Sequence, residues 1–279
     1  MTRFPQFFLR ILPAVALVAA LGLPGPAGSA QAAPASVYLE DLTWTEVRDA
    51  IHAGKTTVII PVGATEQSGP HMALGKHNLR AKVLAGRIAA ALGNALVAPV
   101  LAYVPEGKIS PPAGHMRYAG TISISDEAFK GVLDGAARSF RQHGFTDVVL
   151  IGDHGGYQAQ LGEVAAKLNR DWAGTPARAL FIAEYYRVTE TSYPQALRAK
   201  GLSEAQIGLH AGTADTSLML AVDPAMVRAD RMARDPKEGA PNGLNGDPRA
   251  SSAALGQIGV EMMVDKTVAA IRAAEAARH

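Results

Sequence analysis

The sequence contains no cysteine among its 279 residues. This absence excludes a disulfide framework, a thiol nucleophile and thiolate metal ligands. Any metal ion bound by this chain must therefore be held by histidine, aspartate and glutamate side chains. Eight histidines are available for such a site.

The sequence also lacks a surplus of charge of either sign. It carries 27 basic and 25 acidic side chains, and loss of Arg3 and Arg10 with an N-terminal leader would leave equal numbers. This balance gives no electrostatic reason to expect nucleic acid or an anionic membrane as a partner. We therefore expect no nucleic-acid or membrane partner.

Long apolar runs are missing after the N-terminus. Arg3 and Arg10 precede the apolar run Ile11–Leu23, and small residues follow around Ala30–Ala33. This layout is typical of a secretory signal peptide over residues 1–33, with an uncleaved N-terminal anchor as the alternative. No later segment is apolar for the about 20 residues that a membrane-spanning helix needs. We expect residues 34–279 to form a single soluble α/β domain, periplasmic or secreted, with no membrane attachment after cleavage.

After the leader, apolar runs rich in β-branched residues alternate with amphipathic stretches of helical length. Such alternation is typical of a layered α/β sandwich with a mostly parallel central sheet flanked by helices. The predicted strands are Thr56–Val62, Ala95–Val104, Asp147–Ile151 and Arg178–Tyr185. The predicted helices begin at Asn78 and Ser125, lie near Ala211–Ala221, and cover Ser251–Ala277. Asp235–Pro248 is rich in glycine and proline and is predicted to be irregular.

Three segments combine imidazole or carboxylate side chains with small residues, and two of them directly follow predicted buried strands. Ligand sites in α/β sheets collect at the carboxyl ends of the strands. Each segment alone is a weak signal, because an Asp or His beside glycine is more often a cap or turn residue. Their joint occurrence indicates a shared metal site. The residues concerned are Glu66, His71 and His77 in the first segment, Asp153 and His154 in the second, and His210 and Asp215 in the third.

Five blocks of the sequence, in order, resemble the creatininase (creatinine amidohydrolase) family. They are Pro61–Gln67 with Gly69-Pro70-His71, Gly114-His115 with Gly120–Ser123, Gly155-Gly156 after His154, His210–Gly212 with Thr216-Ser217, and Gly246–Pro248 followed by Ala250-Ser251. The similarity runs from about Leu42 to the C-terminal helix. It implies a layered α/β fold, assembly as a homo-oligomer, and hydrolysis of cyclic or linear C–N amide bonds with one or two divalent metals.

The resemblance also implies roles for individual residues. Glu66 and His154 fall on metal-binding positions of the family, and His210 falls on a catalytic histidine. Asp215 stands where the family usually has a glutamate. His77 occupies the position of an aspartate that bridges two metals.

Two departures from the family pattern concern the metal site. Ser68 replaces a metal-binding histidine, and a neutral imidazole at His77 bridges two metals poorly. We therefore expect one divalent ion per subunit, zinc, manganese or iron, held by Glu66, His77 and His154. Asp215 is either an additional ligand or a base.

The implied mechanism is metal-dependent hydrolysis of a C–N amide bond in a small, possibly cyclic, amide or a short peptide. The metal would lower the pKa of a bound water and polarise the carbonyl, and His210 would carry the proton to the leaving nitrogen.

Three side chains keep alternative roles. Asp153 either orients His154, or binds the metal, or is a solvated turn residue. His71 is expected to be structural or to support a ligand, and His115 either lines the pocket or lies in a surface loop.

Two alternatives come from other functional classes. The first is a binding or assembly protein that keeps the fold after losing part of the metal site. The second is a metal-free hydrolase that uses Ser68 with His71 or His77, which the lack of a Gly-x-Ser-x-Gly motif disfavours.

Overall fold

The computed structural model describes residues 36–232 and 242–277. The predicted signal peptide, residues 1–33, lies outside these described residues, as does the first part of the predicted irregular region, residues 235–241. No described helix is long and apolar enough to cross a membrane.

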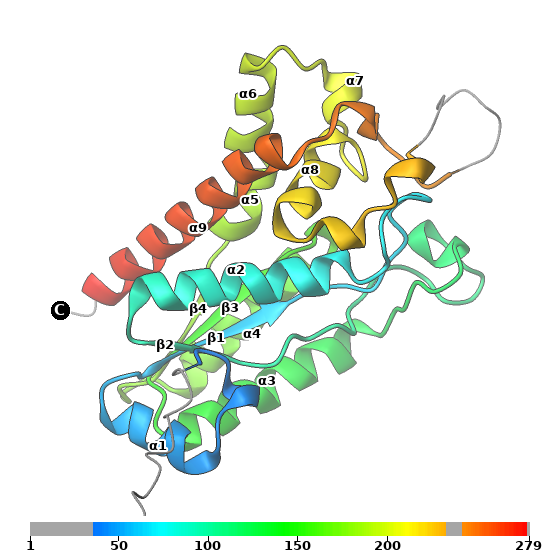
Figure 1. Cartoon of the computed structure of the whole chain (residues 1–279). Helices are drawn as coiled ribbons and strands as arrows, with labels where there is room; N and C mark the ends of the chain where they lie inside the picture. The colour runs from blue at the N-terminus through cyan, green and yellow to red at the C-terminus, as the bar shows by residue number, and fades with distance from the viewer. Residues whose placement is uncertain (1–35, 233–241, 278–279) are drawn as a thin grey trace, which may run out of the picture. The chain divides into compact units, whose positions relative to one another are not determined.

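The described residues form a sheet of four parallel strands in the order β2-β1-β3-β4 (Figure 1). The strands are β1 (Thr57–Val62), β2 (Ala95–Val97), β3 (Asp147–Gly152) and β4 (Arg178–Phe181). Every residue of β1 and β3 is buried, as expected for central strands covered on both faces. The predicted layered α/β class with a parallel sheet is confirmed.

Alternate residues of the central strands pack into two separate apolar layers. Ile59 and Val149 contact one layer, whereas Val58 and Leu150 contact the other. This division follows from the strand period of two, which sends successive side chains to opposite faces. The sheet is therefore the middle of a three-layer sandwich.

Helices α2 (Lys76–Leu92) and α9 (Ala253–Ala276) cover one face of the sheet, and α3 (Asp126–Gln142) and α4 (Gln158–Asp171) cover the other (Figure 1). In α2, Leu84 and Ile88 lie one turn apart and are fully buried against the sheet. The remaining α-helices described are α1 (Trp44–His52), α5 (Glu184–Glu190), α6 (Ser192–Ala199), α7 (Glu204–Ile207) and α8 (Thr213–Val222).

Two predicted strands are too long. The second stops at Val97. The N–H of Ala98 still donates to Ile59 O, but the next bond to β1 comes from Leu101 to Pro61 O, one residue out of register, and only an isolated bridge from Leu101 to Val62 follows. The fourth stops at Phe181, and Tyr185 already belongs to α5.

The predicted helix starts differ in accuracy. Ser125 caps α3 by accepting a hydrogen bond from the N–H of Ala128 at 3.2 Å, as predicted. Asn78 does not cap α2, which begins two residues earlier at Lys76. Its side chain instead accepts a hydrogen bond from the N–H of Ala64 at 3.0 Å and so ties the loop after β1 to the helix.

Candidate metal centre and active site

The loops that follow β1 and β3 lie next to each other at the carboxyl ends of these strands. The hydroxyl of Tyr157 joins them, lying 2.8 Å from the carbonyl oxygen of Val62 and 2.6 Å from that of Gly63. The N–H of Asp153 also donates to Val62 O at 2.9 Å. These bonds bring Glu66, from the first loop, and His154, from the second, to one place.

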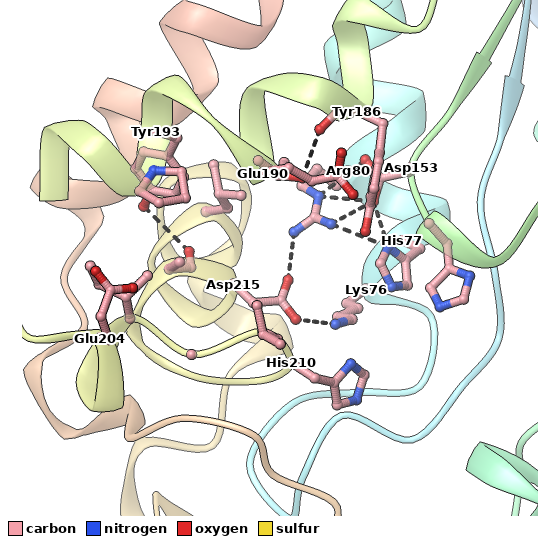
Figure 2. Close-up of a pocket in the computed structure, with 18 of the residues that line it drawn as sticks. Lys76, His77, Arg80, Asp153, Tyr186, Glu190, Tyr193, Glu204, His210 and Asp215 are labelled. Atoms are coloured by element: carbon pink, nitrogen blue, oxygen red, sulfur yellow. Dashed lines mark hydrogen bonds and ion pairs between the residues drawn. The ribbon is translucent and has the colours of Figure 1, made fainter. Parts of the chain in front are cut away.

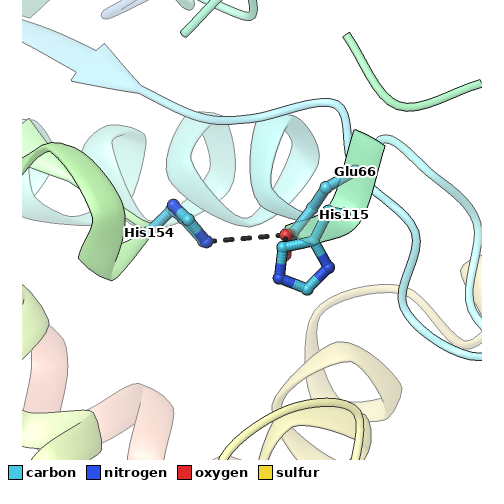
Figure 3. A group of neighbouring side chains, drawn as sticks. All are labelled: Glu66, His115 and His154. Carbon is cyan, nitrogen blue, oxygen red and sulfur yellow. Dashed lines mark ion pairs between the residues drawn. The ribbon is translucent and has the colours of Figure 1, made fainter. Parts of the chain in front are cut away.

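The two carboxylate oxygens of Glu66 face different groups. Its side chain is fully buried. Oε2 lies 3.3 Å from Nε2 of His115 and 3.5 Å from Nε2 of His154 (Figure 3). Within the described part of the chain, Oε2 has no hydrogen-bond partner. Burying a carboxylate oxygen without a partner costs free energy of folding, and a bound cation at this position would offset that cost.

Glu66, His115 and His154 form the candidate metal centre. Each offers one ligand atom, and these atoms lie within 4.8 Å of one another. One carboxylate and two imidazoles are a donor set that zinc, manganese and iron accept, with room left for water. The donors therefore fit a divalent ion.

The charge states at this centre also suit a metal. Burial would raise the pKa of Glu66, but the hydrogen bond with His77 and the nearby charges of His77 and Lys76 lower it overall, so Glu66 is a carboxylate. Burial lowers the pKa of His154 to about 3, which leaves its imidazole neutral at pH 7. A neutral imidazole and an ionised carboxylate are the forms that bind metals.

His77 contacts the other oxygen of Glu66 and is not part of this group of three. Its Nε2 lies 2.8 Å from Glu66 Oε1, and its Nδ1 lies 2.6 Å from Asp153 Oδ1. The sequence therefore correctly places Glu66, His77 and His154 close together, but both ring nitrogens of His77 are engaged by carboxylates.

Asp153 is buried, so the interpretation of this residue as a solvated turn aspartate is wrong. Besides His77, it contacts the guanidinium of Arg80 at 2.7 Å and accepts a hydrogen bond from the Tyr185 hydroxyl at 2.6 Å. Burial would raise the pKa of Asp153, but the positive charge of Arg80 lowers it overall. Among the described contacts, Asp153 orients His77 rather than His154.

Asp215, at the start of α8, forms ion pairs with Lys76 and Arg80 (Figure 2). The Arg80 Nη1 to Asp215 Oδ1 distance is 2.8 Å, and Asp215 Oδ2 also accepts from the N–H of Ala211 at 3.1 Å. The structure thus brings Asp215 into the same pocket as the metal centre, with both oxygens already bonded.

His210 is held with one ring nitrogen toward Glu66. Its Nε2–H donates to the carbonyl oxygen of Gln67 at 2.9 Å, so Nδ1 carries the lone pair. Nδ1 lies 3.8 Å from Glu66 Oε1, and the His210 ring is 4.5 Å from the His115 ring. Burial, followed by the charge of Lys76, lowers the pKa of His210 to about 4. His210 is therefore a neutral proton acceptor at pH 7.

A cavity of about 540 Å³ opens onto these groups. Its lining includes His115, His154, His210 and Asp215, together with Tyr186 from α5 and Tyr193 from α6. This volume suits a small molecule or a short peptide.

His71 does not reach the cavity lining described here, consistent with the predicted structural role. It is fully buried, and its Nε2 lies 2.9 Å from Oγ1 of Thr216 in α8.

Sequence reasoning left His115 undecided and missed Glu106. The His115 side chain is 28% exposed and points to Glu66, so the surface-loop interpretation is wrong. Glu106 is buried, its Oε1 lies 3.4 Å from Nδ1 of His154, and neither oxygen has a hydrogen-bond partner among the described residues. Burial and the charge of Glu66 raise the pKa of Glu106 to about 9. Both residues lie in an irregular Pro- and Gly-rich segment, whose path the sequence pattern does not indicate.

Known proteins show similar sequences and structures. The creatinine amidohydrolase of Pseudomonas putida is 30% identical over 206 residues, which cover 72% of this chain and 77% of that protein. The mycofactocin precursor peptide peptidase of Mycolicibacterium smegmatis is 28% identical over 190 residues, 65% of this chain and 64% of that protein. A solved structure of a creatininase with manganese superposes with a TM-score of 0.70 at 26% identity, covering 85% of this chain and 98% of that chain.

The fold, the carboxylate–imidazole centre and these similarities together define an enzyme of the metal-dependent amidohydrolase class. The family model for creatinine amidohydrolase matches residues 40–271. The chain therefore belongs to the creatininase family.

Proposed function

We propose that this protein hydrolyses a C–N amide bond in a small, possibly cyclic, amide or a short peptide, with one divalent ion held by Glu66, His115 and His154. The observation that carries the proposal is Oε2 of Glu66, which is buried and has no described hydrogen-bond partner, and which faces imidazole nitrogens of His115 and His154, two residues that line the cavity. When bound, zinc, manganese or iron supplies Lewis acidity, which activates a water and polarises the substrate carbonyl. The two similar proteins named above, an amidohydrolase of creatinine and a peptide peptidase by name, support both substrate classes.

His210 is the proposed proton carrier. Because Nε2–H is fixed on Gln67 O, Nδ1 carries the lone pair that would accept a proton from the attacking water, and His210 lines the cavity. The same nitrogen then donates that proton to the leaving nitrogen as the C–N bond breaks. Its lowered pKa keeps Nδ1 unprotonated, and therefore ready to accept, at neutral pH.

His77 and Asp215 are predicted from the sequence to be metal ligands. We propose instead that each holds a neighbouring charged side chain in place. His77 holds Glu66 by its Oε1, so that Oε2 stays directed at His115 and His154. Asp215 holds Lys76 and Arg80, which line the same cavity.

Elemental analysis combined with a hydrolysis assay tests this function. We expect near-stoichiometric metal in the purified protein and its loss in a Glu66→Gln/His154→Ala double variant. Hydrolysis of cyclic amides and of short peptides should require the metal and be restored by adding it back. A folded wild-type chain that binds no metal and hydrolyses neither class would instead identify a binding or assembly protein.

We further propose that the mature protein is exported to the periplasm or beyond and is a homo-oligomer. The signal-peptide pattern of residues 1–33 supports export, and the family resemblance supports the oligomer. Cell fractionation and light scattering of the mature protein test the two points separately.

A further inference from the structure

We propose that Lys76 and Arg80 are fixed positive charges that take the place of a second metal ion, so that each subunit binds a single divalent ion on the Oε2 side of Glu66. The inference rests on the metal centre proposed above. It concerns the Oε1 side of Glu66. Without Lys76 and Arg80, the metal ligands available on this side would be Glu66 Oε1, His77, Asp153 and Asp215.

The ammonium group of Lys76 stands between two of these carboxylates. Lys76 is fully buried, its Nζ bonds to Asp215 Oδ2, and it lies 3.7 Å from Glu66 Oε1. A divalent ion coordinated by both Glu66 Oε1 and Asp215 would have to sit in contact with this ammonium. Two cations in direct contact repel strongly in a buried site, because little water screens their charges. Lys76 therefore blocks this position by its positive charge.

Arg80 satisfies the remaining oxygens on this side. Its guanidinium contacts Asp215 Oδ1 at 2.8 Å and Asp153 Oδ1 at 2.7 Å (Figure 2). Asp153 Oδ2 accepts from the Tyr185 hydroxyl, and Asp215 Oδ2 accepts from Lys76 and from the N–H of Ala211. Both oxygens of Asp153 and of Asp215 thus already have hydrogen-bond or ion-pair partners.

In the described part of the chain, the carboxyl oxygens of the site that lack partners lie on the other side of Glu66. Among the described residues, the carboxylate oxygens at the site that lack a hydrogen-bond partner are Glu66 Oε2 and the two oxygens of Glu106. Glu66 Oε2 faces His115 and His154, and Glu106 Oε1 faces His154. The described contacts thus leave Glu66 Oε2 open to a metal ion, whereas Glu66 Oε1 already lies beside the ammonium of Lys76.

Metal stoichiometry tests this division of the site. Bound metal is first removed from the mature protein with a chelator. The protein is then titrated with Zn²⁺ by equilibrium dialysis, and bound zinc is measured by elemental analysis. We expect one ion per wild-type chain. In Lys76→Met, which removes the ammonium and keeps the length of the side chain, we expect a rise to two ions, the second weaker than the first.

Three further variants control this experiment. Lys82 lies on the same helix, α2, but its side chain is partly exposed and pairs with Glu40. The Lys82→Met variant should therefore still bind one ion. Lys76→Arg retains the positive charge and should also keep one ion. Lys76→Met/Asp215→Asn removes the ammonium together with the carboxylate that would hold a second ion, so its stoichiometry should stay at one.

Two results would overturn the inference: two ions per wild-type chain, or a single ion in folded Lys76→Met. If Lys76→Met does not fold, Lys76→Gln replaces it with the same expected rise, since the amide is neutral. A wild-type chain that binds no zinc would refute the metal centre itself, which is distinguishable from the two-ion result. The readout is bound metal, so failure to find the substrate does not affect the outcome.

Discussion

His115 Nε2 lies 3.3 Å from Glu66 Oε2, so an irregular loop between β2 and α3 supplies a donor to a centre whose other members follow β1 and β3. This relationship predicts that His115 contributes to metal affinity. We expect His115→Ala and His154→Ala each to weaken zinc binding by more than about 10-fold, the lower bound for groups that merely support a ligand. His77→Ala should weaken it less than either. Competition titration with a zinc chelator measures all three, and an unchanged affinity in His115→Ala would remove this residue from the centre.

His210 is predicted to act in catalysis and not in metal binding. His210→Ala should lower kcat by roughly 10²- to 10⁴-fold, the usual contribution of a positioned acid–base group. Bound metal should stay at the wild-type level, because the contacts of His210 run to the Gln67 backbone and its Nδ1 faces Glu66 Oε1, not Oε2. Activity that survives, or metal that is lost, would each contradict the assigned role.

The buried histidine His71 is predicted to make stability depend on pH. Burial lowers its pKa from 6.5 to about 4, so between these values the unfolded chain takes up a proton that the folded chain does not. Stability from this group is therefore complete above pH 6.5 and falls as the pH drops toward 4, by a total of roughly 3 kcal/mol. Urea unfolding at pH 7 and pH 4 should show wild type losing more stability than His71→Gln. Equal losses in the two proteins would show that His71 does not titrate in this way.

The close approach of α8 and α9 depends on Gly256. A Cβ atom at this position would meet the carbonyl oxygen of Ser217 at 1.8 Å, which is backbone and cannot turn aside. Gly256→Ala should therefore destabilise the protein by about 1–3 kcal/mol or more.

Gly131→Ala is the matched control for this change. Gly131 lies in α3, and a Cβ there has no described neighbour within 4 Å. This substitution should stabilise the helix by about 0.5–1 kcal/mol, because alanine has less backbone entropy to lose. Thermal unfolding of both variants compares them, and similar shifts in Tm would show that the helix contact is looser than described.

Export predicts a shortened N-terminus. Mass spectrometry of the protein recovered from the periplasm or medium should give a chain beginning near Pro34. A full-length chain retained with the membrane fraction would support the uncleaved anchor instead.

The sequence determined the layered α/β fold because each layer leaves a local pattern. Thr57–Val62 and Asp147–Gly152 are apolar throughout most of their length, as buried parallel strands must be, and Ser125 gives a local capping signal for α3. The sequence also brought Glu66, His154 and His210 into one site, because two of them directly follow such strands and all three match family blocks. The strand ends were less accurate, since ladder bonds depend on partners distant in the chain.

Only the tertiary structure decided how these side chains share the site. Both ring nitrogens of His77 face carboxylates, and Asp215 is held by Lys76 and Arg80, because α2 and α8 meet beside the loop after β3. His115 and Glu106 reach Glu66 and His154 from a segment without periodicity, so no local pattern indicates their direction. Residue types and order along the chain fix which ligands are available. Which oxygen or nitrogen faces which depends on contacts between segments that are distant in sequence, and these arise only when the layers pack.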